Sequence, residues 1–188
     1  MTATEFFTTS DGERIAFRSE RDGGGLFVMG ATGESVRRVT DAGFDPSWSP
    51  DGRRLVYATE EVFDPVSRDG NSELWIVEVD SGGKTLLSSG DAVQPAWSRQ
   101  GDRIAYWANT QGQRDLWTVA AAGGEPVVVT RDAATDWSPE WSPDGRWLHF
   151  ASDRGGSYNL WRVEIDPATG GAAGLPQPVT TGVRGMGY

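Results

Sequence analysis

The sequence predicts an all-β protein, a β-propeller built from four blades of four strands each. Three observations lead to this prediction: a motif that recurs four times, turn glycines at regular spacing, and no helical period in any window of the chain. Repeats of about 40 to 50 residues with four short strands each are typical of propeller blades. β-Branched and aromatic residues fill the expected strands, and Gly, Pro, Asp and Ser fill the gaps between them.

The first signature of each repeat is a Trp-Ser-Pro-Asp-Gly turn that leads into a short apolar strand. It runs from Trp48 to Tyr57 and again from Trp141 to Phe150, with looser copies at Trp97 to Tyr106 and Thr8 to Phe17. In such a turn Pro presets the first corner of a type I turn and Gly follows it. The turn glycines, which lie 40, 49 and 44 residues apart, are Gly12, Gly52, Gly101 and Gly145.

The second signature is a strand of the Leu-Trp-x-Val type, followed by a stub rich in Val, Leu and Thr. It stands at Leu74 to Val77, Leu116 to Val119 and Leu160 to Val163, with Leu26 to Val28 as the first copy. Together the two signatures predict four strands per repeat, which we name A to D in chain order. The expected blades cover residues 5–40, 44–87, 93–130 and 136–181 of a single domain, and a tail follows at 182–188.

These motifs carry a resemblance to a known family. The Trp-Ser-Pro-Asp-Gly-Arg turn, followed in the fourth copy by Ser-Asp-Arg from Ser152 and by Leu160-Trp161, resembles the PD40 repeat. That repeat occurs in TolB-like propellers and in the propellers of tricorn-type and S9 peptidases. The resemblance covers essentially the whole chain and implies the fold, but no particular activity. The first copy has Thr8 in place of Trp, and the third has Arg99-Gln100 in place of Pro-Asp.

Four blades leave the closure of the ring open. PD40 propellers usually have more than four blades, so the resemblance implies an open half-ring with two exposed apolar blade faces. Three outcomes remain: two chains pair into an eight-bladed propeller, the four blades close alone, or the sequence belongs to a longer propeller protein. We favour the homodimer, because a symmetric pair covers both faces. The expected seam residues are Phe6, Phe7 and Phe17 of blade one, Trp141, Trp147 and Trp161 of blade four, and Tyr188 of the tail.

Composition excludes several kinds of chemistry. The chain has no Cys and one His, His149, so thiol catalysis, Cys-ligated metals and two-histidine sites are excluded. It contains no P-loop, no Gly-x-Gly-x-x-Gly after a strand and no Gly-x-Ser-x-Gly. The turn aspartates are expected to cap their own turns. We therefore predict no catalytic residues, no metal, no other cofactor, and a protein that is not an enzyme.

Charge is concentrated at one end of the predicted propeller. The net charge of −10 argues against nucleic-acid binding. The B–C and D–A loops share one end and hold 14 acidic and 5 basic residues, whereas the A–B and C–D loops hold nine of each. Two interpretations remain: a solvated surface that aids solubility, or a recognition surface for a cationic peptide or protein. The second interpretation names Glu60, Glu61, Phe63 and Asp64 of the longest loop, and Trp137, as candidate partner-binding residues.

Three functions remain open for this sequence. The first is a non-enzymatic propeller, a scaffold or protein- or peptide-interaction module that self-assembles through its open blade faces. The second is a fragment of the gating propeller of an S9- or tricorn-like peptidase, and a TolB-like periplasmic interaction propeller is a third reading. Residues Met1 to Asp11 lack the basic and apolar segments of a signal peptide, and no apolar run could span a membrane. A cytoplasmic location is therefore expected, or a periplasmic one if a leader precedes this sequence.

Overall fold

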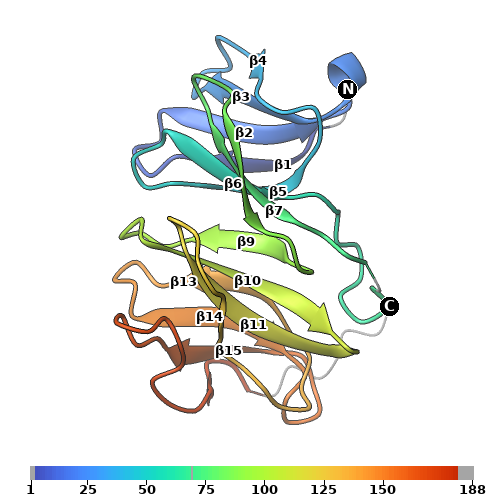
Figure 1. Cartoon of the computed structure of the whole chain (residues 1–188), viewed down its shortest axis with the longest axis vertical. Coiled ribbons are helices and arrows are strands. Elements are labelled where there is room, and N and C mark those ends of the chain that lie inside the picture. Colours follow the sequence, from blue (N-terminus) through green and yellow to red (C-terminus); the bar gives the residue numbers. More distant parts are fainter. Residues whose placement is uncertain (1–2, 69, 182–188) are drawn as a thin grey trace.

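Four antiparallel sheets of four strands follow one another along the chain, and we call them blades 1 to 4 (Figure 1). The computed structural model describes residues 3–68 and 70–181, with residues 3–5 described by their backbone alone. Blades 1 and 2 comprise β1 (Ala3–Thr8), β2 (Arg14–Ser19), β3 (Leu26–Gly30), β4 (Arg37–Arg38), β5 (Phe44–Trp48), β6 (Arg54–Ala58), β7 (Leu74–Glu78) and β8 (Lys84–Ser88). Blades 3 and 4 comprise β9 (Val93–Trp97), β10 (Arg103–Thr110), β11 (Gln113–Ala120), β12 (Val127–Val128), β13 (Asp136–Trp141), β14 (Trp147–Ser152), β15 (Asn159–Glu164) and β16 (Gln177–Pro178).

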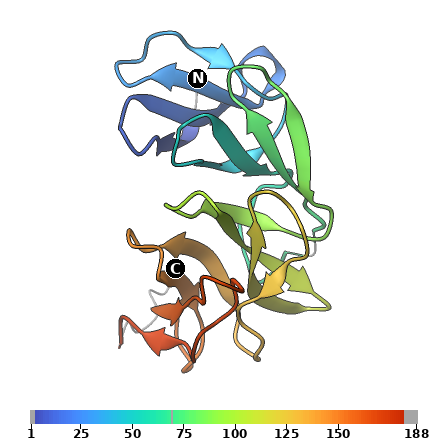
Figure 2. The same cartoon turned by 60° about the vertical axis from the view of Figure 1, so that its left-hand side comes forward.

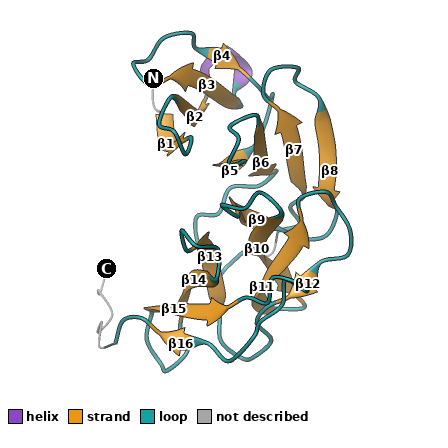
Figure 3. Ribbon diagram, turned by 90° about the vertical axis from the view of Figure 1, so that its left-hand side faces the viewer, coloured by secondary structure: helices purple, strands orange, loops and turns teal. Residues whose placement is uncertain are grey.

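The blades are stacked in chain order along the long axis of the molecule (Figures 1 and 2). Figure 3 shows that they form an open arc, with β1, β5, β9 and β13 on its concave side and β4, β8, β12 and β16 on its convex side. Neighbouring blades touch through their innermost strands, β1 against β5, β5 against β9 and β9 against β13. The predicted all-β fold with four four-stranded blades is therefore confirmed. The arc is compatible with an eight-bladed pair, and that pairing stays a prediction.

Blade 2 contributes its two faces to two different hydrophobic clusters, because side chains alternate along a strand. In blade 2, Leu55 and Val77 pack with residues of blade 1, whereas Val56 and Ile76 pack with residues of blade 3. The second of these clusters runs on through blades 3 and 4. Trp107 is its largest side chain with no exposed surface, and burying such a ring removes a large apolar area from water.

Each of the four innermost strands is interrupted once, at the same place in its blade, and the sequence motifs did not predict this. Each one shifts register once against its neighbour, as between Phe44 and Ser47 in blade 2. At this shift Asp45, Gln94 and Ser138 adopt φ angles of 49°, 49° and 50°. Each of the three precedes a proline, which has no N–H to donate to the sheet. The extra residue is therefore accommodated as a β-bulge.

The A–B turns are closed by their own side chains, as expected for the turn aspartates. In blade 2 the Ser49 hydroxyl donates to Asp51 Oδ1 at 2.6 Å and accepts from the Arg54 N–H at 2.9 Å. The bond from Ser49 and a second from the Arg53 N–H hold the pKa of Asp51 below its usual range. Gly52 sits at φ 64° in the same turn, a conformation that glycine adopts without strain.

Candidate functional site: the acidic loop end and the open blade faces

The long loop between β6 and β7 is anchored to blade 3 by one buried arginine. The Arg68 guanidinium donates to both carboxylate oxygens of Asp91, at 2.7 and 2.5 Å, and to Glu60 Oε2 at 2.6 Å. Only 4% of the Arg68 side chain is exposed. A buried bidentate pair of this kind is geometrically specific, so it sets the position of the loop.

The β10–β11 hairpin holds the backbone of the same loop. Arg114 donates to the carbonyl oxygens of Pro65, Val66 and Arg68, and Asn109 Nδ2 donates to the Arg68 carbonyl at 3.0 Å. These bonds join positions more than 40 residues apart in the chain. These bonds hold residues 65–68 of the loop against one end of blade 3.

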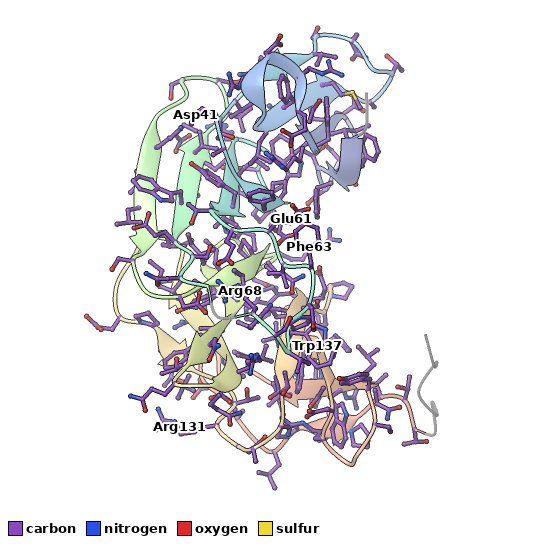
Figure 4. All side chains as sticks on the ribbon, turned by 90° about the vertical axis from the view of Figure 1, so that its right-hand side faces the viewer. Asp41, Glu61, Phe63, Arg68, Arg131 and Trp137 are labelled. Atoms are coloured by element: carbon purple, nitrogen blue, oxygen red, sulfur yellow. The ribbon has the colours of Figure 1, made fainter. Side chains whose placement is uncertain are left out.

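The candidate residues of this loop differ in what they leave free for a partner. Glu60 is ion-paired with Arg68, and Asp64 accepts from the Val66 N–H and the Ser67 hydroxyl. The Ser67 bond is the main cause that lowers the pKa of Asp64. Phe63, in contrast, is 87% exposed. Figure 4 shows Glu61, Phe63 and Arg68 together on the loop.

Trp137 lies on a different blade from the other four candidates. It is half-buried on β13 and packs edge-on against Tyr158, with ring centroids 5.2 Å apart. It also contacts the core cluster of blades 2 to 4. The structure therefore divides the five candidates between the blade 2 loop and the edge of blade 4. Whether any of them binds a partner stays a prediction.

A cluster of carboxylates between blades 3 and 4 was not anticipated from the sequence. Arg154 pairs with Asp136 at 2.6 Å and with Asp132 at 3.1 Å, and Asp115 is only 5% exposed beside them. Burial, with the charges of Asp136 and Asp132, raises the pKa of Asp115 to about 6. Burial also raises the pKa of Asp136. No motif identifies this cluster, because Asp115 and Asp136 come from different blades.

The open face of blade 1 is formed by stacked phenylalanines. Phe6 is 60% exposed and lies 6.0 Å from Phe17, which in turn lies 5.8 Å from Phe27. Phe7, the neighbour of Phe6, packs instead against the cluster shared with blade 2, and its carbonyl accepts from Trp48 Nε1 at 2.9 Å. Of the expected seam residues of blade 1, only Phe6 is thus exposed on the open side. Phe17 points to the same side but is 2% exposed under Phe6 and Arg21, and Phe7 faces blade 2.

Blade 4 differs from expectation in the same way. Trp141 and Trp161 pack against the cluster shared with blade 3, and Trp141 Nε1 donates to the Ala96 carbonyl at 3.1 Å. Trp147 alternates with the buried Leu148 and stacks under the Arg162 guanidinium, 4.2 Å away. Of the three tryptophans, therefore, Trp147 faces away from blade 3. Tyr188 lies outside the described residues, and the seam itself stays a prediction.

Two cavities of about 480 and 190 Å³ lie along the concave side. Residues of all four innermost strands line the larger one, including three expected seam residues, Phe6, Phe7 and Trp141. None of the five candidate partner-binding residues lines either cavity.

Across the residues that the structure describes, no three His, Asp or Glu side chains are arranged to hold a metal ion. No helix within that part of the chain is long and apolar enough to cross a membrane.

Comparison with known proteins identifies the family. Residues 42–174 match the model of the PD40 family, the TolB beta propeller domain. The chain belongs to this family. The sequence is 26% identical over 163 residues to Atu1656, an uncharacterised protein of Agrobacterium fabrum, covering 83% of this chain and 53% of that protein. It is 31% identical over 151 residues to the uncharacterised peptidase YuxL of Bacillus subtilis, covering 76% of this chain and 20% of YuxL.

The fold agrees with a solved member of the family. A TolB structure from Agrobacterium tumefaciens superposes with a TM-score of 0.74 at 23% identity, covering 92% of this chain and 63% of that one. The match to the PD40 model confirms the predicted resemblance, and the superposition shows the same fold. The chain spans about half the length of Atu1656 and a fifth of YuxL, so these relatives contain further sequence that has no counterpart among the 188 residues.

Proposed function

We propose that this PD40 propeller is a non-enzymatic interaction module that binds other polypeptides through its open blade faces. The observation that carries the proposal is the open arc, in which blade 1 has no neighbouring blade on the side where Phe6 is 60% exposed over the buried Phe17 and Phe27 (Figure 3). Apolar surface of this kind is characteristic of protein interfaces. The lengths of the relatives support the proposal. The chain covers only 53% of Atu1656 and 63% of the TolB structure, so both of these proteins contain sequence in addition to the part that matches this four-bladed arc.

A second copy of the chain is one candidate for covering both faces, in a head-to-tail ring of eight blades. Sedimentation equilibrium at micromolar concentration tests it, with an expected mass of twice 20.3 kDa. Phe6→Asp should reduce this mass to that of the single chain, because it puts a charge on the open side of blade 1. Phe63→Asp is the matched control and should leave the mass unchanged. A single-chain mass for the unmodified protein would reject the homodimer.

The acidic loop end is the second surface of the proposed module, with a cationic peptide as its partner. Glu61 and Phe63 are the loop residues that we expect to contact the peptide, because Glu60 and Asp64 already have partners within the loop. Binding of an oligolysine peptide should weaken as salt is raised and should weaken further in Glu61→Gln, since exposed charges attract through screened fields. Glu13→Gln, on an A–B turn at the other end, is the control. If Glu61→Gln and Glu13→Gln bind the peptide equally well, the acidic loop end is a solvated surface and not a binding site.

The other candidate function is part of a peptidase, and the similarity to YuxL favours it. In that case the propeller would filter substrates for a catalytic domain outside these 188 residues. Sequencing the coding region on both sides of the chain distinguishes the two functions: a Gly-x-Ser-x-Gly domain would support the peptidase. The interaction module predicts no turnover of fluorogenic peptides by the isolated chain, because one His and no Cys leave few catalytic combinations.

A further inference from the structure

Two arginines of the chain occupy nearly identical places in blades 1 and 4. Arg154 lies over Phe150 and Trp161, at 5.4 and 5.3 Å from the ring centroids. Arg21 lies over the corresponding rings of blade 1, Phe17 and Phe27, at 5.5 and 5.4 Å.

The local hydrogen bonds of the two arginines match as well. Arg154 donates from its backbone N–H and from Nε to the Ser152 hydroxyl, and Arg21 donates in the same way to Ser19. The two arginines are therefore held by equivalent neighbours within their own blades.

They differ in their carboxylate partners. Arg154 pairs with Asp136 and Asp132, which lie on the segment that enters blade 4 from blade 3. Asp136 stands opposite Ser152 in the sheet, and the residue in that register position opposite Ser19 is Ala3. The neighbouring Glu20 pairs with Arg18. Among the residues whose side chains are described, no carboxylate lies within ion-pair distance of Arg21.

A carboxylate from the preceding interblade segment is a recurring partner in this chain. Arg68 lies over Trp107 at 5.4 Å and pairs with Asp91, which stands on the segment from blade 2 to blade 3. Arg21, like Arg68 and Arg154, lies over a buried aromatic ring, but at the end of blade 1 that has no preceding blade. Half-buried guanidinium groups that stack on aromatic rings are well suited to binding carboxylates.

We propose that the open face of blade 1 docks a further propeller blade whose last strand is followed by an aspartate or glutamate, and that Arg21 receives this carboxylate. The inference rests on the proposed function, and it specifies the chemistry of the partner.

The loops that follow blades 1, 2 and 3 each contain an acidic residue of this kind, namely Asp41, Asp91 and Asp132. The sequence from Thr180 to Tyr188 contains no Asp or Glu. The blade 4 end of a second copy therefore does not supply the carboxylate, and the docked blade belongs to a different polypeptide segment.

The first test uses the chain's own carboxylate-bearing segment as a probe. A labelled peptide with the sequence of residues 127–136 should bind the full chain in fluorescence anisotropy. A peptide with Asn in place of both Asp residues should bind at least about tenfold more weakly, since hydrogen bonds between charged groups are the stronger ones. Arg21→Gln should lose the same factor, whereas Arg53→Gln, an exposed arginine of an A–B turn, should bind as the unmodified chain does.

The second test supplies the carboxylate within the chain. Ala3→Asp should raise the thermal midpoint by about 2–4 °C over Ala3→Asn, and the gain should vanish when Arg21→Gln is added. The proposal is overturned if the unmodified chain does not favour the aspartate peptide, or if Ala3→Asp gains nothing over Ala3→Asn. A homodimer that survives Arg21→Gln unchanged would also overturn it, by making a second copy the occupant. A monomer that binds the aspartate peptide would reject the homodimer and support the inference.

Discussion

Replacing Asp115 with asparagine tests the electrostatics of the junction between blades 3 and 4. The Asp115 carboxyl is 5% exposed, its Oδ1 has no hydrogen-bond partner, and its pKa is raised from 3.8 to about 6. A folded-state pKa above the unfolded one means that the folded protein binds this proton more tightly. The stability that this proton contributes is fully present below about pH 4, and it is lost as the pH rises to about 6.

The size of the effect follows from the shift. A change of about two pKa units corresponds to about 3 kcal/mol at 1.36 kcal/mol per unit. Asp115→Asn removes the charge and keeps a similar shape, so the variant should be more stable than the unmodified chain by about 2–3 kcal/mol at pH 7.5. At pH 4 the two proteins should differ by less than about 1 kcal/mol, because the carboxyl is then protonated in the folded state and close to its midpoint in the unfolded state, so that little free energy is lost on folding.

Urea unfolding at pH 4, 6 and 7.5, followed by tryptophan fluorescence, measures this difference directly. Asp132→Asn is the matched control: its carboxylate is 47% exposed in its pair with Arg154, and exposed pairs are worth about 1 kcal/mol or less. The reasoning is refuted if Asp115→Asn gains no stability at pH 7.5, or if it gains the same amount at pH 4.

Three further predictions concern the loop anchor, the core and the blade 1 face. Arg68→Gln should destabilise the chain by about 3–5 kcal/mol in urea unfolding, because it leaves the Asp91 carboxylate buried without its partner. Hydrogen exchange should become faster within residues 59–73 but not in the turn around Gly52. Trp107→Ala should cost about 3–5 kcal/mol, whereas Trp147→Ala should cost less than half of that; equal losses in thermal or urea unfolding would contradict the assigned faces of blades 3 and 4. Phe6→Asp should change the stability of a monomer by less than about 1 kcal/mol, because Phe6 is 60% exposed, whereas Phe7→Asp should destabilise the chain strongly. If thermal melting shows Phe6→Asp to be the more destabilising variant, the assignment of Phe6 to the open side of blade 1 is wrong.

The repeat made most of the fold predictable. The four Trp-Ser-Pro-Asp-Gly-type turns and the four Leu-Trp-x-Val-type strands are local patterns, and local patterns determine where strands and turns begin and end. The Ser49 and Asp51 turn illustrates this, since all of its hydrogen bonds lie within six residues. The acidic end could also be predicted, because strand order alone decides which loops share an end.

The facing of individual aromatic residues could not be predicted in the same way. Phe6 and Phe7 are adjacent, so they point to opposite sides of blade 1, and the side of each depends on the register of β1 against β2. That register shifts between Ala3 and Phe6, as it does at the corresponding bulge of every innermost strand. The prolines after Asp45, Gln94 and Ser138 were the available signal in the other three blades, because a proline inside a strand indicates a bulge or an edge.

The sequence by itself determined the family, the four blades, their turns and the concentration of acidic residues at one end, because each of these depends on neighbours along the chain. Only the tertiary structure decided which charges are free, since Arg68 meets Asp91 and Arg154 meets Asp136 across junctions between separate strands or blades. It also decided that Arg21 lies stacked at the open end of the arc without a described carboxylate beside it. The physical reason is that burial and ion pairing depend on which residues the fold brings into contact. The partners in these pairs are 18 or more positions apart, so no local sequence pattern indicates that they meet.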